Sequence, residues 1–458
     1  MFPDNFKKRL RTQDYIDSDL LLEALTQPSQ VSIRLNPHKW NRVPAGSDRV
    51  PWCSTGFYLA SRPSFTADPL FHSGCYYPQE ASGMFLEEIF RHCFSGRDDL
   101  RVLDLCGAPG SKSTHLSALI GNNGYLISNE VIRSRAVVLA ENITRWGIPN
   151  AMVTNNDPAD FSRLAGFFDL IVVDAPCSGE GMFRDPVARR EWSERNAELC
   201  QRRQRRILSD VWPALKENAI LIYSTCTFNP AENEENIKWL TGNMRAENLR
   251  ISIASFPAIT EIHYEGITGY GFFPGRVKGD GFFVSVVRKN ENNGGIKLIK
   301  RKSVKQVSKE EQKTAEKLTG GLKGTILKIN EVLYHTPPDA DEYLTLSDLL
   351  RIIKPGTGLL RLVKGETFPE HSLAVSLLPG KNNFPGIELN YDQAVSYLKK
   401  ENPGIEVREK GWYLAAYRGG NLGFLKSTGT RFNNHLPVNL RIRMTGEALK
   451  EKQIIEWY

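Results

Sequence analysis

The chain has 458 residues, enough for about two to four domains and for a large core that needs no disulfides or metals. Lysine and arginine number 59 and aspartate and glutamate 52, so the formal net charge is +7. This modest positive excess allows a polyanionic partner but excludes a histone-like tail. Charged residues make up 24% and aromatic residues 10% of the chain, which excludes wholesale disorder.

The cysteines and the N-terminus indicate the compartment. None of the seven cysteines forms a Cys-x-x-Cys pair, so neither a zinc ribbon nor a thioredoxin-type pair is predicted. An odd, scattered set predicts reduced thiols and a cytoplasmic protein. Residues 1–15 lack the apolar segment of a signal peptide, and no run of about 18 apolar residues predicts a membrane span. The eight histidines show no metal-ligand spacing, so we assign no metal.

Residues 1–70 are predicted to form a small N-terminal domain. It begins with an amphipathic helical pattern, in which Phe6, Leu10 and all but one residue of the run Leu20–Leu25 are apolar. The sequence VSIRLNPHKW follows and predicts a strand that ends at Pro37. A stretch rich in proline and serine then leads into the next domain.

Residues 71–290 alternate between strand-like and helix-like segments. The longest helical pattern covers 191–217, and the sequence 269–289 predicts a hairpin with Gly-rich turns. Short apolar runs that predict strands occur at 100–106, 124–130, 151–157, 168–174 and 219–226. Apolar strands separated by helices are typical of a parallel sheet covered on both faces. We therefore predict an α/β fold, a doubly wound Rossmann-like sheet with an antiparallel strand at one edge.

The chain changes character at about residue 290. Residues 291–319 are polar and mostly basic, which predicts a linker. Residues 320–384 predict an intermediate α/β domain. Residues 385–458, with short strands and Gly-rich turns, predict a mostly β module.

A turn of small residues joins the first strand of the predicted sheet to the next helix. Its sequence, LDLCGAPGSKS at 103–113, lets the backbone approach a ligand and presents free N–H groups where the helix begins. Gly107 and Gly110 lack the third glycine of a dinucleotide fingerprint, and no Walker motif is present. Nicotinamide and triphosphate ligands are therefore disfavoured. Taken alone, the turn fits a ligand cradle and a purely structural connection equally well.

Acidic residues follow the next three predicted strands. Glu130 ends the second strand, where a carboxylate can accept hydrogen bonds from both ribose hydroxyls. Asp157 ends the third strand, within reach of an adenine amine, and Asp174 ends the fourth. Each alone could be a solvated loop carboxylate. Because all three lie at the carboxyl edge of the sheet, where ligands of such folds bind, the set favours an adenosyl ligand.

Two cysteines follow neighbouring strands at the same edge. Cys177 comes after an Asp-x-Pro turn, and Cys226 comes after a Ser-Thr pair. A lone buried cysteine is usually a small apolar side chain, but two at the active edge indicate chemistry. Methylation of a pyrimidine at C5 needs a thiolate that adds to C6, and a base that removes the C5 proton afterwards. The target base must also leave its stack to reach the pocket.

Several motifs together resemble the Nol1/Nop2/Sun family of S-adenosylmethionine-dependent RNA cytosine-C5 methyltransferases. They are LDLCGAPGSKS, DAPCSGEGMFR and STCTFNPAENEEN, supported by SIRLNPHK, HSGCYYPQEASG and GFFPGRVKGDGFF, and they occur in order over residues 30–290. The sequence 411–443 resembles the PUA-like RNA-binding module of bacterial members. The whole arrangement is most similar to the bacterial branch that acts on 16S rRNA.

The resemblance implies roles for particular residues. Cys226, in the Thr-Cys motif, corresponds to the nucleophile, and Cys177 to the cysteine that assists product release. Asp174 would contact the target cytosine and lie beside the cofactor. Ser111 stands where many members have glycine, and its small side chain should fit. S-adenosylmethionine would be bound by Gly107, Ala108, Pro109, Gly110, Ser111, Lys112, Ser113, Glu130, Asp157 and Asp174.

The family further implies an RNA-methylating enzyme that acts as a monomer, with 16S rRNA or the small ribosomal subunit as partner and with no metal or membrane. Residues 1–70 and 385–458 would bind RNA. Four arginines on the predicted helix at 191–217 fit a solvated face and a phosphate contact about equally: Arg202, Arg203, Arg205 and Arg206.

Three alternatives stay open at this point. A tRNA cytosine-C5 methyltransferase shares the catalytic motifs, and only the C-terminal module favours the ribosome. A non-catalytic RNA-binding assembly factor would be free to lose the two cysteines, which this chain keeps. An amino-methyltransferase would need an Asn/Asp-Pro-Pro-aromatic turn where this chain has Asp-Ala-Pro-Cys.

Overall fold

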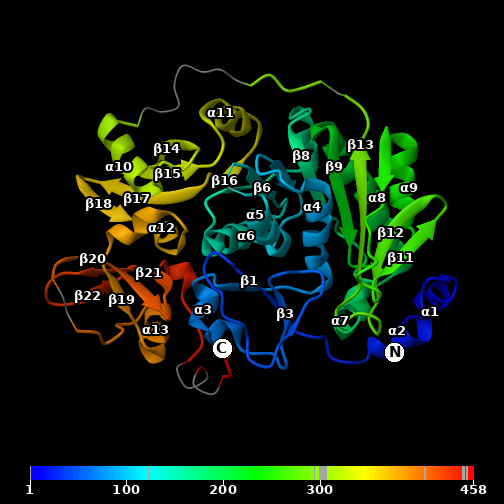
Figure 1. Ribbon diagram of the computed structural model, residues 1–458, viewed down its shortest axis with the longest axis horizontal. Helices are drawn as coiled ribbons and strands as arrows, with labels where there is room; N and C mark the ends of the chain where they lie inside the picture. The colour runs from blue at the N-terminus through cyan, green and yellow to red at the C-terminus, as the bar shows by residue number, and fades with distance from the viewer. Residues whose placement is uncertain are drawn as a thin grey trace.

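The computed structural model describes residues 2–121, 123–292, 294–298, 307–406, 409–445, 449 and 452–458. Its centre is a ten-stranded sheet with the strand order β11-β12-β13-β9-β8-β5-β6-β7-β16, and β10 pairs with β13 beside this path. Three four-stranded sheets lie around it, one built from N-terminal residues and two from residues after 320 (Figure 1).

Five parallel strands form the middle of the central sheet, where the apolar runs predict them. They are β5 (Arg101–Asp104), β6 (Tyr125–Asn129), β7 (Ala151–Thr154), β8 (Phe168–Asp174) and β9 (Leu215–Thr225). Along β8, Leu170 and Val172 pack on one face, and Ile171 and Val173 pack on the other. Because both faces are buried, the central residues of these strands are mostly apolar instead of alternating with polar residues.

Helices cover both faces of this sheet. One face packs against α4 (Leu86–Phe94), α5 (Ser111–Leu119) and α6 (Arg133–Trp146). The other packs against α8 (Glu194–Val211), α9 (Glu234–Asn243) and the 3-10 helix η3 (Pro158–Arg163). None of the helices in the described part of the chain is long and apolar enough to cross a membrane.

The helical pattern predicted over 191–217 is divided in the structure. The short helix α7 (Pro186–Glu191) ends first, and the Ser193 side chain then caps α8 by accepting the Asn196 N–H at 3.2 Å. Pro213 lies in the 3-10 helix η5 (Trp212–Ala214) that follows α8. A serine cap and a proline are ordinary signals for the start and the end of a helix.

Antiparallel strands flank the parallel ones on both sides. β13 (Phe282–Lys289) pairs with β9, and β12 (Ile267–Phe272), β11 (Thr260–Tyr264) and β10 (Ala246–Leu249) extend this edge. The predicted hairpin and the predicted Rossmann-like sheet with an antiparallel edge are thereby confirmed. At the opposite edge, β16 (Ile352–Lys354) pairs with β7, although it comes from the segment predicted as a separate intermediate domain.

Residues after 307 form helices and two further sheets. Helix α10 (Lys309–Thr319) lies inside the segment predicted as a linker, because Ser308 and Glu311 form a capping box and Leu318 is buried. Residues 299–306 of that segment lie outside the described residues. One sheet contains β14 (Thr325–Ile329), β15 (Val332–Thr336), β17 (Thr357–Val363) and β18 (Glu366–Pro369), with α11 (Ala340–Leu349) and α12 (His371–Val375). The other contains β19 (Gly386–Glu388), β20 (Gly411–Tyr417), β21 (Gly420–Ser427) and β22 (Phe432–Asn434), with α13 (Tyr391–Leu398).

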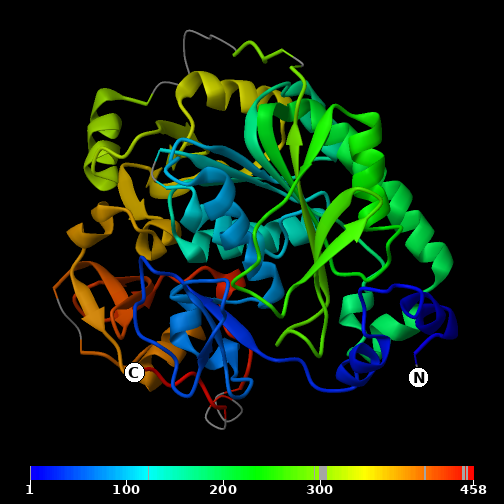
Figure 2. The same ribbon diagram turned by 45° about the vertical axis from the view of Figure 1, so that its right-hand side comes forward.

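The N-terminal residues begin with two helices and then form a sheet. The helices are α1 (Asp4–Leu10) and α2 (Ser18–Ala24), and α3 (Pro69–His72) follows later. The sheet contains β2 (Asp48–Arg49), β3 (Gly56–Tyr58), β1 (Ser32–Leu35) and β4 (Tyr76–Pro78). Figure 2 shows α1 and α2 apart from that sheet, beside α7.

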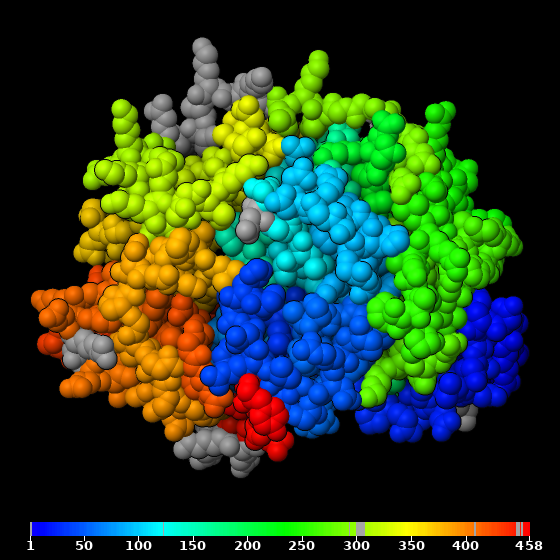
Figure 3. All heavy atoms as spheres, in the orientation of Figure 1, coloured from blue at the N-terminus to red at the C-terminus, as the bar shows by residue number. Residues whose placement is uncertain are grey.

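The N-terminal sheet and the C-terminal sheet share one hydrophobic core. Ile33 and Tyr76 pack in the same cluster as Tyr397 and other apolar residues of the C-terminal unit. Near the end of the chain, the ring centroids of Trp40 and Trp457 are 5.3 Å apart. The space-filling view shows the last residues, in red, lying against the N-terminal unit, in blue (Figure 3). The first and last folded units therefore bury apolar surface together.

Helix α11 packs on the central sheet through apolar residues and one buried carboxylate. Glu342 forms an ion pair with Arg101 of β5, and it accepts a hydrogen bond from the Tyr125 hydroxyl of β6 at 3.0 Å. The Glu342 side chain is 7% exposed, so its charge depends on these partners. This contact joins the residues after the linker to two strands of the central sheet.

We predict that Glu342→Ala lowers the free energy of unfolding by about 2–4 kcal/mol, because it leaves the Tyr125 hydroxyl and the Arg101 guanidinium without their acceptor. Urea unfolding followed by tryptophan fluorescence measures this change. The matched control is Glu366→Ala in the same unit, whose carboxylate is 69% exposed and 3.7 Å from Lys426. That variant should change stability by less than about 0.5 kcal/mol. Equal effects in the two variants would contradict the docking role.

Candidate active site

The two cysteines predicted at neighbouring strand ends lie in contact. β8 and β9 are parallel neighbours, and Asp174 is opposite Ser224 in their register, so the loops that follow leave the sheet at the same edge. The Sγ atoms of Cys177 and Cys226 are 3.1 Å apart. The Cys226 N–H also donates to the Cys177 sulfur at 3.3 Å. The parallel register thus brings together two thiols that are 49 positions apart in the chain.

The surroundings of Cys177 favour its protonated form. The hydrogen bond with the Cys226 side chain and burial both raise the pKa of Cys177 well above its ordinary value, and the negative charge of Glu232 adds to the effect. Cys177 therefore stays a neutral thiol at physiological pH. In that state it can donate its proton to the sulfur of Cys226.

A pocket of about 790 Å³ opens beside these sulfurs at the carboxyl edge of the sheet. Several strand ends contribute to its wall, and the lining includes Ala108, Glu130, Asp157, Asp174, Cys177 and Cys226. The three acidic residues predicted at strand ends therefore surround one space. Glu130 is buried, accepts the Ile132 N–H at 2.9 Å and lies 3.4 Å from the Arg135 guanidinium.

The small-residue turn before α5 is held by buried hydrogen bonds. The Ser113 hydroxyl donates to Asp104 at 2.6 Å and lies 2.6 Å from the Ser128 hydroxyl. Burial raises the pKa of Asp104 to about 7, and its Oδ1 has no hydrogen-bond partner among the described residues. A Cβ on Gly107 would come within 2.5 Å of the Ser128 hydroxyl, so only glycine fits there.

The residues of this turn do not all face the same space. Ala108 lines the larger pocket, whereas Ser111 and Lys112 line a second cavity of about 280 Å³. Gly110 is turned toward α6, where a Cβ would meet Leu139 and Asn142. Within the described chain, four of the predicted cofactor residues line neither space: Gly107, Pro109, Gly110 and Ser113. They shape the turn from behind.

The smaller cavity shares a wall with the larger pocket. Asp174, Ala175, Met182 and Cys226 line both. Lys112 lines the smaller cavity, with its ammonium 2.8 Å from Asp174 on the shared wall. Burial lowers the pKa of Lys112, but the charges of Asp174 and Asp104 outweigh burial, so the pKa lies above its ordinary value. A positive charge thus lies near the Cys226 side chain.

Asp174 is fixed from two sides. Its second oxygen accepts a hydrogen bond from the Ser224 hydroxyl at 2.7 Å, while Lys112 holds the first. Asp174 is the last residue of β8, and Ser224 is opposite it on β9. The carboxylate therefore has a defined orientation between the two cavities.

The residues of the larger pocket fit S-adenosylmethionine. Its volume suits a nucleoside with an amino-acid arm. Glu130 offers a buried carboxylate at the end of β6 for the ribose hydroxyls, and the turn before α5 brings the backbone close to the ligand. Asp157 already accepts a hydrogen bond from Arg206 at 2.7 Å, so an adenine amine would share it with that arginine.

The arginine cluster on α8 lies at the mouth of this pocket. Arg202, Arg203 and Arg206 line it, while Arg205 turns away and donates to Asn236 at 3.0 Å. Arg206 is paired with Asp157 and Asp210, so Arg202 and Arg203 are the arginines of this pocket that are placed to meet a phosphate backbone. From the sequence alone, a solvated face and a phosphate contact were equally expected for these arginines. Their position in the wall of the pocket favours the phosphate contact.

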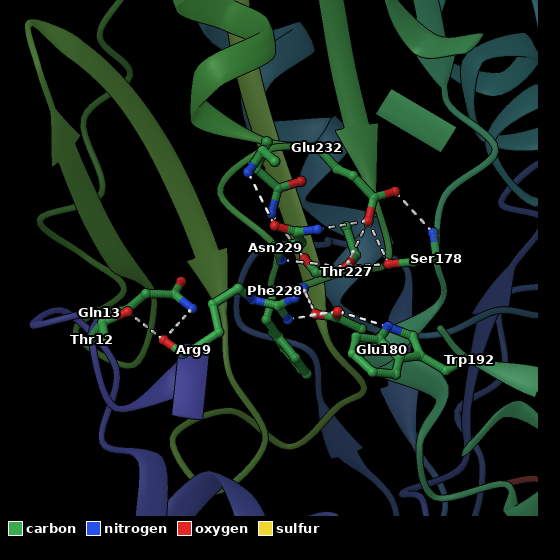
Figure 4. Close-up of polar contacts among 12 residues, drawn as sticks. Arg9, Thr12, Gln13, Ser178, Glu180, Trp192, Thr227, Phe228, Asn229 and Glu232 are labelled. Carbon is green, nitrogen blue, oxygen red and sulfur yellow. Dashed lines mark hydrogen bonds and ion pairs between the residues drawn. The ribbon is translucent and has the colours of Figure 1, made fainter. Parts of the chain in front are cut away.

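Two buried glutamates next to the cysteines were not among the site residues predicted from the sequence. Glu180 follows Cys177 by three residues, and Glu232 follows Cys226 by six. Both are fully buried and hydrogen-bonded (Figure 4). The signal was available in the runs SGEG and PAEN, because a glutamate in a turn after a functional cysteine needs a partner when it is buried.

A further cluster lies away from the pocket, and sequence spacing gave no sign of it. Glu87 accepts from the Cys53 thiol at 3.1 Å, from His115 at 3.3 Å and from the Ser54 N–H at 3.0 Å. Burial raises the pKa of Cys53 to about 12 and lowers that of His115 to about 4. These groups form one hydrogen-bonded set next to the positive charge of the buried Arg34, and Nδ1 of His115 has no hydrogen-bond partner among the described residues.

The sheet, the nucleoside-sized pocket and the paired thiols define the class of the protein, an S-adenosylmethionine-dependent methyltransferase with a two-cysteine site. Family models match three parts of the chain. They describe the 16S rRNA methyltransferase RsmB/F over residues 93–288, the N-terminal domain of 16S rRNA methyltransferase RsmF over 2–81 and the methyltransferase RsmF PUA domain over 384–442.

Known proteins agree with this match. Ribosomal RNA small subunit methyltransferase F from Aliivibrio fischeri is 30% identical and covers 96% of this chain and 97% of its own. The protein of the same name from Shewanella loihica is 29% identical over 93% of this chain and 92% of its own. A methyltransferase homolog protein from Pyrococcus horikoshii has a similar structure, with a TM-score of 0.53 and 27% identity over 63% of this chain and 95% of that one. The chain belongs to the RsmF family of 16S rRNA methyltransferases and is an RNA methyltransferase that uses S-adenosylmethionine.

Proposed function

We propose that this protein methylates C5 of a cytosine in 16S rRNA through a covalent bond between Cys226 and C6 of the base. The observation that carries the proposal is the position of the two thiols. The Cys226 sulfur lies on the wall shared by the two cavities and 3.1 Å from the sulfur of Cys177. A base in the smaller cavity would then meet a nucleophile and a methyl donor from two sides.

The attack by Cys226 makes C5 reactive. Addition of its thiolate to C6 forms a C6–S bond, removes the aromaticity of the ring and moves electron density to C5. The positive charge of Lys112 stabilises the thiolate, and Asp174, held by Lys112 and Ser224, contacts the base. Bound in the larger pocket, S-adenosylmethionine supplies the methyl group as an electrophilic carbon.

Release of the product requires the second cysteine. After methyl transfer, C5 carries both the methyl group and a proton. A base removes this proton, the C5–C6 double bond forms again and the bond between C6 and Cys226 breaks. Cys177 assists this elimination, because its thiol stays protonated and can donate to the departing Cys226 sulfur.

The cofactor and the RNA have separate binding residues in this proposal. Glu130, Asp157 and Ala108 hold the cofactor directly, while the rest of the turn positions Ala108 and Lys112. Arg202 and Arg203 contact the RNA backbone at the pocket mouth. Residues 1–70 and 385–458 add RNA contacts, supported by the matches to RsmF terminal domains. We further propose that the protein acts as a monomer on the small ribosomal subunit RNA in the cytoplasm.

The substrate is tested by bisulfite sequencing of total RNA from a strain that lacks the gene. We expect a cytosine in 16S rRNA to lose its protection from conversion, and the intact gene on a plasmid to restore it. A plasmid that carries Cys226→Ala should not restore it. Loss of protection in a tRNA with 16S rRNA unchanged would contradict the proposed substrate.

The two cysteines should give opposite results on denaturing gels with RNA and S-adenosylmethionine. Cys226→Ala should abolish methyl transfer and form no adduct, because the attacking sulfur is gone. Cys177→Ala should accumulate a cofactor-dependent protein–RNA adduct, because attack proceeds and elimination stalls. Cys93→Ala, a half-buried cysteine on α4, is the control and should behave like the wild type. An adduct that forms only in Cys226→Ala would contradict this assignment, because the attacking sulfur would then lie in the other loop.

Glu130→Ala should weaken binding of S-adenosylmethionine by about 1–3 kcal/mol, the usual loss for a hydrogen bond to a charged group. Isothermal titration calorimetry measures the affinity. The control is Glu191→Ala, an exposed glutamate at the end of α7, which should bind the cofactor unchanged. Unchanged affinity in Glu130→Ala would remove Glu130 from the cofactor site.

A further inference from the structure

The two cysteine loops are fastened to each other by a reciprocal pair of glutamates. Glu180, in the loop that carries Cys177, accepts the Phe228 N–H of the other loop at 3.2 Å. Glu232, in the loop that carries Cys226, accepts the Ser178 N–H at 2.9 Å and also the Ser178 hydroxyl. Figure 4 shows the two carboxylates between the loops, each directed at the neighbouring loop. We name Glu180 and Glu232 the glutamate clasp.

Backbone contacts follow the same pattern. The Gly181 N–H donates to the carbonyl of Cys226 at 2.9 Å, and the Ala175 N–H donates to the carbonyl of Ser224 at 2.8 Å. The two loops are therefore hydrogen-bonded to each other before and after each cysteine. The contact between the sulfurs is fixed by these bonds and not by the thiols alone.

The charge of Glu180 is balanced from another part of the chain. The Glu180 side chain is 0% exposed, and its Oε1 lies 2.6 Å from the guanidinium of Arg9 on helix α1. Trp192 donates its indole N–H to the same oxygen at 2.9 Å. A carboxylate buried this deeply needs a cation beside it to stay ionised. The N-terminal helix supplies that cation.

The N-terminal segment has a second attachment close by. The Tyr15 hydroxyl donates to Glu234 at 3.3 Å, and Glu234 begins helix α9 just after the Cys226 loop. Phe6 of α1 packs against Phe183 with ring centroids 4.8 Å apart, which ties the helix to the loop of Cys177. Residues before 16 thus contact the loop of Cys177 and the helix that follows the loop of Cys226, although they line neither cavity in the described structure.

We propose that Arg9, Glu180 and Glu232 are positioning residues that hold the sulfurs of Cys177 and Cys226 at hydrogen-bond distance, so that the N-terminal helix completes the active site. The inference rests on the proposed roles of the two cysteines. Elimination needs a proton to pass between groups about 3 Å apart, and a displacement of about 1 Å can cost up to about 100-fold in rate.

The first test measures, in a single turnover with saturating RNA and cofactor, the rate at which methylated RNA is released from the covalent adduct. Arg9→Ala should lower this rate about 10- to 100-fold and leave cofactor affinity unchanged. Arg9→Lys should recover part of the loss, because it restores the cation. The double variant Arg9→Ala/Glu180→Gln should be faster than Arg9→Ala, because no unpaired buried charge remains and the glutamine still accepts the Phe228 N–H.

The control is Arg11→Ala, which removes an exposed arginine just after the same helix and should leave the rate unchanged. Circular dichroism and cofactor affinity establish that each variant is folded. If Arg9→Ala does not fold, the comparison of Glu180→Gln and Glu232→Gln with the wild type replaces it, since each keeps one acceptor oxygen, removes the charge and turns the other acceptor into an NH2 donor. Rates equal to that of the wild type in all folded variants of Arg9, Glu180 and Glu232 would overturn the proposal.

A second readout does not depend on RNA or on methyl transfer. In a buffer of reduced and oxidised glutathione, a protein thiolate displaces one glutathione from the oxidised form, and the second protein thiol then displaces the other. This forms the Cys177–Cys226 disulfide and releases two molecules of reduced glutathione. Its equilibrium constant, measured from the linked peptides by mass spectrometry, reports how well the fold holds the two sulfurs together.

We expect this constant to fall about tenfold in Arg9→Ala and in Glu232→Gln, and to stay at the wild-type value in Arg11→Ala. An equilibrium constant equal to that of the wild type in both Arg9→Ala and Glu232→Gln would overturn the positioning role, whatever the methylation data show. If instead the wild-type protein methylates no RNA while the constant falls as expected, the proposed function fails and the positioning role stands. The two readouts therefore separate one failure from the other.

Discussion

Two thiols held 3.1 Å apart are the constraint on which the rest of this site depends. Parallel pairing of β8 and β9 brings the cysteine loops to one edge, but strand ends alone place side chains only to within several ångströms. The remaining precision comes from buried polar groups, and every buried carboxylate needs donors or a counter-charge. This requirement extends the site beyond the sheet, through Glu180 to an arginine on the first helix.

Much of the central domain could be predicted from the sequence, because its signals are local. Apolar runs gave the five parallel strands, and Glu130, Asp157 and Asp174 surround one pocket because strand ends share an edge. Features that depend on distant partners could not be predicted. The three-residue strand β16 has no periodicity of its own, and Arg9 looks like any surface arginine until Glu180 is placed beside it. The roles of the individual site residues remain predictions.

The shared wall between the two cavities explains why residues of one motif serve different purposes. Ala108 faces the larger pocket, and Lys112, four residues later, faces the smaller one, because helix α5 begins at Ser111 and turns the chain. Motif membership alone therefore assigns Lys112 to the cofactor, whereas its ion pair assigns it to Asp174. A substitution in this turn can change base contact and cofactor contact separately.

The core shared by the first and last units has a consequence for synthesis on the ribosome. At about 5–20 residues per second, Trp40 leaves the ribosome roughly 20–80 s before Trp457. During that interval, apolar residues such as Ile33 and Tyr76 lack the C-terminal side of their core. The nascent chain therefore exposes an apolar surface until translation is nearly complete, and this surface must not aggregate with neighbouring chains. Chaperones that bind exposed apolar segments have a defined target here, and premature termination leaves that target uncovered.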